Sequence, residues 1–107
     1  MANERRLIQA ILDIGLEDLI GLPELLFEHD VLAAAGTENA IDDISAALVE
    51  LCEQGQVKVW VGTSYEDAVP IDLDVAIAVL RDRTRYFADA LPVSGPRVFY
   101  ANVANIP

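Results

Sequence analysis

The chain has 107 residues, one cysteine and a net charge of −11, the balance of 18 acidic and 7 basic side chains. This length predicts one domain over residues 1–107, and the lone cysteine excludes an intrachain disulfide or a cysteine-based zinc cluster. Its apolar runs are far shorter than the roughly 18 residues of a membrane-spanning helix, so we expect a cytoplasmic protein with no membrane partner.

Two helices are predicted in the first third of the chain. Apolar residues at helical spacing indicate a helix over residues 4–14, with Gly15 ending it in the left-handed conformation. Pro23 suits the first turn of a second helix, which we expect over residues 23–35. His29 would be partly buried on its apolar side, and it has no second metal ligand at helical spacing.

The third helix has the clearest signals. Thr37 is a good N-cap, and Gly55 is a good stop. Its predicted buried stripe consists of Ile41, Ile44, Leu48, Leu51 and Cys52. The next segment, QVKVWVG, alternates apolar and polar side chains, and a period of two predicts a strand over residues 57–61.

The remaining elements are a loop, a short helix and a returning strand. Residues 63–70 are polar and predict a loop, after which Asp72 or Asp74 can cap a helix ending near Leu80. The alternating segment RVFYANV, residues 97–103, should pair with the strand at residues 57–61.

The segment AIDDISAALVELCEQGQVKVW, residues 40–60, resembles the helix, glycine and strand pattern of the winged-helix superfamily. The opening ILDIGLEDLIGLPE is similar to that of uncharacterised bacterial winged-helix proteins. The resemblance implies an α+β fold in which three N-terminal helices precede a two-stranded antiparallel wing. The departure from the family is a short helix inserted between the wing strands.

The resemblance gives the third helix a DNA-recognition role, which its charge opposes. Residues 7–57 contain eleven acids and no lysine or arginine. A carboxylate about 7 Å from a phosphate is repelled by roughly 0.6 kcal/mol in bulk water, so DNA binding through this face is disfavoured. The predicted solvent face also includes Ala46 and Val49; its candidate interaction residues are Asn39, Asp42, Asp43, Glu50 and Glu53. They either attract a basic protein or form a solvated surface.

A second candidate surface is basic and aromatic. Its members are Lys58, Trp60, Arg81, Arg83, Arg85 and Arg97. The arginines either form a docking edge near the wing or pair with Asp82, Asp89 and the acidic helices. Trp60 is expected to be exposed or to be covered, either by the inserted helix or by residues 84–93.

No nucleophile motif, phosphate loop or metal motif is present, so we expect no enzyme activity and no cofactor. The leading hypothesis is a non-enzymatic winged-helix module for protein–protein interaction or assembly. A high apolar content of 53% also favours a homodimer. The alternatives are a transcriptional regulator that docks on DNA through its wing and arginines, and an acidic, immunity-type inhibitor of a basic protein.

Overall fold

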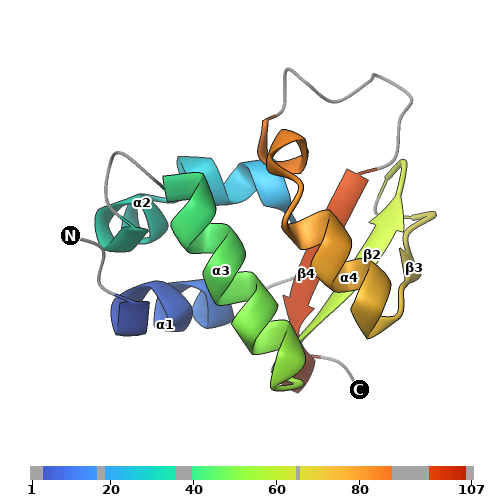
Figure 1. The fold of residues 1–107 in the computed structure, drawn as a ribbon, viewed down its shortest axis with the longest axis horizontal. Coiled ribbons are helices and arrows are strands. Elements are labelled where there is room, and N and C mark those ends of the chain that lie inside the picture. Colours follow the sequence, from blue (N-terminus) through green and yellow to red (C-terminus); the bar gives the residue numbers. More distant parts are fainter. Residues whose placement is uncertain (1–3, 17–18, 36–39, 65, 88–96, 106–107) are drawn as a thin grey trace.

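The computed structural model describes residues 4–16, 19–35, 40–64, 66–87 and 97–105. The chain forms a compact α+β domain with helices and a four-stranded antiparallel sheet (Figure 1). The elements in chain order are α1 (Glu4–Ile14), β1 (Ile20–Gly21), the 3-10 helix η1 (Leu22–Phe27), α2 (His29–Ala35), α3 (Ala40–Glu53), β2 (Val57–Gly62), β3 (Val69–Pro70), α4 (Leu73–Leu80), the 3-10 helix η2 (Arg83–Tyr86), β4 (Arg97–Asn102) and the 3-10 turn η4 (Val103–Asn105).

The first predicted helix is confirmed at both ends, but its glycine has a different function. Gly15 lacks the positive φ that we expected, since Gly55 is the glycine with positive φ among the described residues. A Cβ at Gly15 would lie 2.8 Å from the backbone nitrogen of Asn102, so the close approach of β4 requires a glycine there. The Asn102 amide donates to the Gly15 carbonyl at 3.1 Å and joins the end of α1 to β4.

The second helix was predicted as one element and is two. Glu28 has an extended backbone between η1 and α2, which changes the direction of the chain. Because of this break, Leu25 and Val31 can both be buried in the core although they lie on separate elements. Because of the same break, His29 does not lie on an apolar side of a continuous helix. It is exposed, so the prediction of a partly buried histidine was wrong.

α3 is the central helix and follows its prediction closely. Four of the five predicted core residues are buried, and Cys52 is half-buried. Gly55, at φ +74°, ends the helix in the left-handed conformation, and the Gln56 amide donates to the Leu51 carbonyl at 2.9 Å. The prediction for Val49 was wrong: it is 5% exposed because α4 packs against this side of α3.

The sheet has the strand order β1-β4-β2-β3. The predicted pairing of β2 with β4 is confirmed, and Val59 lies opposite Tyr100. The prediction of only two strands was wrong, because two-residue strands β1 and β3 extend the sheet at its two edges. Residues 63–70 are therefore not all loop, and Pro70 lies on edge strand β3, where a missing amide donor is tolerated.

The helices and one face of the sheet share a hydrophobic core. In Figure 1, α4 crosses in front of β2 and β4, and α3 lies beside it. The largest fully buried side chains of this core include Tyr86, Tyr100, Leu7, Ile11, Ile44, Leu48 and Leu80. α4 therefore has an apolar side in the core, through Ala76 and Leu80, and a second boundary with α3 at the surface.

Candidate functional site

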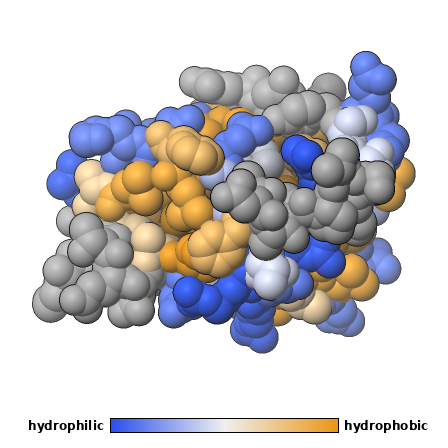
Figure 2. Space-filling model, turned by 90° about the horizontal axis from the view of Figure 1, so that it is seen from above, coloured by the Kyte–Doolittle hydropathy of each residue, from blue (hydrophilic) through white to orange (hydrophobic). Residues whose placement is uncertain are grey.

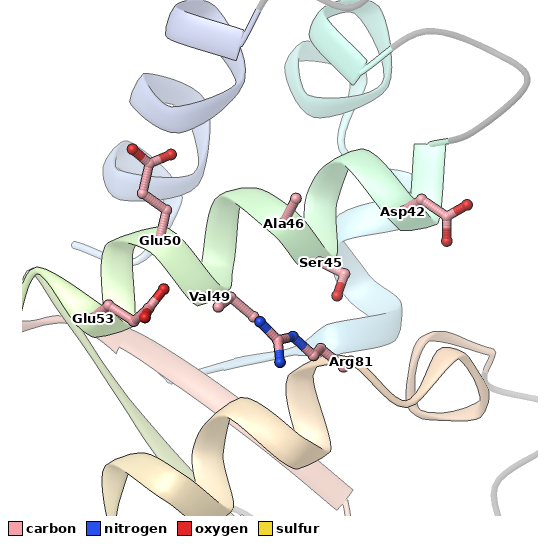
Figure 3. A pocket seen from close by; sticks show the side chains of 7 residues that line it. All are labelled: Asp42, Ser45, Ala46, Val49, Glu50, Glu53 and Arg81. Carbon is pink, nitrogen blue, oxygen red and sulfur yellow. The ribbon is translucent and has the colours of Figure 1, made fainter.

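An open groove runs along the surface where α3 meets the end of α4 (Figure 3). Its volume is about 450 Å³. The lining residues are Asp42, Ser45, Ala46, Val49, Glu50, Glu53 and Arg81. Six of these seven come from α3, and three of those six are carboxylates of the predicted interaction face. We call this groove the acidic groove.

The wall formed by α4 is fixed by hydrogen bonds at one carbonyl group. The Leu80 carbonyl accepts from the Ser45 hydroxyl at 2.7 Å and from the Tyr86 hydroxyl at 2.6 Å. The last carbonyls of a helix have no partner within it, so α3 and η2 together satisfy one at the end of α4. This arrangement holds α4 against the middle of α3.

Among the described residues that line the acidic groove, Arg81 is the one cation beside the carboxylates. The exposed Arg81 side chain extends toward the α3 surface between Ser45 and Glu53 in Figure 3. Arg83 forms an ion pair with Asp42 in the first turn of α3. Two members of the predicted basic patch therefore lie beside the predicted acidic face, which they partly neutralise.

The remaining residues of the predicted acidic face do not all line the acidic groove. Asp43 is half-buried on the other side of α3, where it lines a smaller hollow with Glu4 and Leu7 of α1. Glu50 and Glu53 line the acidic groove, and Glu50 accepts a hydrogen bond of 3.4 Å from the Gln54 side chain. Asn39, the predicted base-reading residue, lies outside the described residues.

The predicted basic and aromatic patch is divided between two sides of the molecule. Lys58 and Trp60 alternate with the core valines on β2, and the Lys58 ammonium lies 5.8 Å from the centroid of the Trp60 ring. Arg97 is exposed at the start of β4, opposite Gly62. These side chains belong to the sheet face away from the shared core, whereas Arg81 lines the groove on the helical side.

Arg85 is held locally. Its guanidinium Nε donates to the Asp82 carboxylate at 3.3 Å. Asp82 also accepts from the Thr84 hydroxyl at 2.7 Å and from the Thr84 amide, and these hydrogen bonds keep the pKa of the Asp82 carboxyl below its usual range. The predicted pairing of arginines with Asp82 and the acidic helices is therefore seen for Arg85 and Arg83, whereas Asp89 lies outside the described residues.

Trp60 is half-buried. Its predicted cover, residues 84–93, is described only as far as Phe87.

The described residues contain no group of three or more side chains suited to hold a metal ion. Burial, with a smaller effect from the Glu53 carboxylate, raises the pKa of the Cys52 thiol, so its reactive thiolate form is disfavoured. Among the described residues, no helix has the length and apolar character to cross a membrane.

No protein-family model, curated protein or solved structure significantly matches this chain. The functional conclusion therefore depends on the geometry and charge of the groove and on the surfaces around it.

Proposed function

We propose that this chain is a non-enzymatic, winged-helix-like module for protein–protein interaction, whose acidic groove receives a cationic segment of a partner. The observation that supports this proposal is the composition of the α3 surface. Asp42, Glu50 and Glu53 line a groove beside the small side chain of Ala46. The winged-helix likeness itself is supported by the three α-helices α1, α2 and α3, which precede the antiparallel pair β2 and β4.

The position of α4 argues against a DNA-reading role for α3. A recognition helix enters the major groove with one face free to contact base edges. Here Val49 is buried against α4, and the Ser45 hydroxyl donates a hydrogen bond to the Leu80 carbonyl. Steric cover by α4 and repulsion by the carboxylates act on the same helix face, so both disfavour the duplex.

A lysine-rich or arginine-rich segment fits the groove chemically. Its aliphatic stems can pack on Ala46 while its charged ends pair with Glu50 and Glu53. Arg81 can donate hydrogen bonds to a carboxylate or a backbone carbonyl of the same segment. Such a surface attracts basic partners through the long-range field of a chain with net charge −11.

A charge-matched binding experiment tests this role. The probe is a fluorescent deca-arginine peptide, titrated with the protein and followed by fluorescence anisotropy. Glu50→Lys/Glu53→Lys should weaken binding at least about tenfold more than Glu66→Lys/Asp74→Lys, which makes the same change in net charge outside the groove. Equal weakening by the two double variants would show attraction by net charge alone and would contradict the proposal.

The inhibitor alternative uses the same acidic groove. It requires that a basic enzyme loses activity when it is bound, whereas an assembly module leaves a partner active. An activity assay on a captured partner separates these two roles.

A further inference from the structure

A second surface, on the side of η1, α2 and η2, is apolar. Phe27 is 82% exposed at the end of η1, Phe87 is 44% exposed directly after η2, and Leu32 on α2 is 39% exposed. η1 packs against both α2 and η2. Figure 2 views the molecule from this side and shows hydrophobic surface gathered there. We call Phe27, Leu32 and Phe87 the aromatic face.

The exposure of Phe27 has an energetic consequence. Full burial of a phenylalanine side chain stabilises by roughly 1.5–3 kcal/mol, and aromatic residues are enriched in protein interfaces. Monomeric proteins rarely leave large contiguous apolar patches in water. The aromatic face therefore has the composition of a contact surface.

Charges of opposite sign border the aromatic face on different elements. Glu28, between η1 and α2, and Asp30, in the first turn of α2, are exposed and follow Phe27 closely in the chain. Arg83 begins η2, the element that precedes Phe87. The ion pair of Arg83 with Asp42 leaves both side chains 57% exposed, and surface pairs of this kind are worth little, so the guanidinium can take another partner.

We propose that the aromatic face is a homodimer interface, with a second copy of this chain as its occupant. A two-fold axis brings the same patch of two subunits together, so that residue i of one copy meets residue j of the other and the reverse. Phe27 and Phe87 then pack in the centre. The carboxylates Glu28 and Asp30 of one copy face Arg83 of the other.

The mixed charge of the border favours a second copy over a purely cationic partner. A cationic partner would be attracted by Glu28 and Asp30 and repelled by Arg83. A second copy presents both signs in the complementary order. This inference is independent of the proposed function, because the acidic groove lies on α3 and its peptide binding needs no dimer.

Sedimentation equilibrium of the full chain tests the interface. We expect a dimer at protein concentrations of about 1 to 200 µM. Phe27→Ser should raise the dimer dissociation constant at least about tenfold, because aromatic residues at an interface centre carry much of the binding energy. Val75→Ser on α4 is the matched control, since Val75 is 50% exposed on another element, and it should leave the constant unchanged.

Charge reversal tests the arrangement of the two copies. Glu28→Arg and Arg83→Glu should each weaken the homodimer, and an equal mixture of the two variants should form a heterodimer in which both ion pairs are restored. Circular dichroism confirms that each variant is folded.

A monomer at 200 µM would overturn the proposal. Dissociation by Val75→Ser as strong as that by Phe27→Ser, or the absence of mixed dimers, would also overturn it. Deca-arginine binding by the Phe27→Ser variant should persist, so that failure of the interface and failure of the groove are distinguishable.

Discussion

At the scale of single residues, two buried tyrosines connect distant parts of the chain. The Tyr100 hydroxyl donates to the Ile11 carbonyl at 2.8 Å, and the Tyr86 hydroxyl donates to the Leu80 carbonyl. Both rings are fully buried. Burial raises the pKa of both hydroxyls well above the usual value, because an ionised phenolate would lose its hydration inside the protein.

The raised pKa values predict that stability is lost in alkaline solution. A tyrosine in the unfolded chain ionises near pH 10, whereas Tyr86 and Tyr100 remain neutral at that pH in the folded chain. Their contribution is therefore fully present below about pH 10 and is lost as the pH rises toward the folded values. Each group should lower the free energy of unfolding by up to about 1.4 kcal/mol per pH unit in this window.

Urea denaturation at pH 8, 10 and 11 measures this effect. Tyr86→Phe and Tyr100→Phe should each cost about 1 kcal/mol at pH 8, where a hydrogen bond is lost, and each should reduce the slope above pH 10. The same slope in wild type and in the double variant would contradict the assignment.

At the scale of elements, the turn between α3 and β2 depends on a backbone conformation. Gly55 has φ +74°, and a Cβ built there meets no atom within 4 Å. Gly55→Ala should therefore destabilise the fold by about 1–2 kcal/mol through backbone strain alone. Gly55→Asn should cost less, since asparagine tolerates this conformation. Urea denaturation of the two variants tests the order, and an alanine variant as stable as wild type would contradict it.

The contact between α3 and α4 depends on a hydroxyl group. Ser45→Ala removes the 2.7 Å hydrogen bond to the Leu80 carbonyl, which still accepts from Tyr86. We expect a loss of about 1 kcal/mol in the free energy of unfolding and faster amide hydrogen exchange in residues 73–80. Ala46→Ser, on an exposed neighbouring position of α3, is the control. Unchanged exchange in α4 of the Ser45→Ala variant would mean that this bond does not hold the helix.

The sequence predicts those elements whose side chains follow a regular period. α1, α3 and the pair of β2 with β4 were predicted correctly because their apolar residues recur at helical or alternating spacing. β1 and β3 have two residues each, too few to show a period, and they form because a neighbouring strand offers hydrogen bonds. The break at Glu28 likewise depends on tertiary packing.

The same limit applies to the candidate site. Asp42, Glu50 and Glu53 were predicted on one face of α3 from helical spacing, and they do line one groove. The burial of Val49 and the placement of Arg81 and Arg83 beside those acids could not be predicted. They depend on where α4 and η2 pack, about forty residues along the chain, and local sequence carries no signal for that contact.

At the scale of the whole molecule, the net negative charge is confined to one part of the chain. The net charge of −11 arises within residues 7–57, which include most of α1 and all of α2 and α3, whereas the remaining residues are balanced. Lys58 and Arg97 lie on the sheet, away from the helices that carry the acids. A phosphate backbone approaching α3 would therefore meet the part of the chain that carries its net negative charge.

Fluorescence anisotropy of a labelled random DNA duplex at low salt tests the central claim, that the α3 surface suits cationic protein partners and repels nucleic acid. We expect no DNA binding in the range of roughly 10⁻⁴–10⁻⁶ M typical of non-specific DNA-binding proteins, while deca-arginine binds under the same conditions. Salt-sensitive binding of the duplex in this range, lost in Lys58→Ala/Arg97→Ala or in Arg81→Ala/Arg83→Ala, would contradict the account and identify a regulator that docks through its wing and arginines.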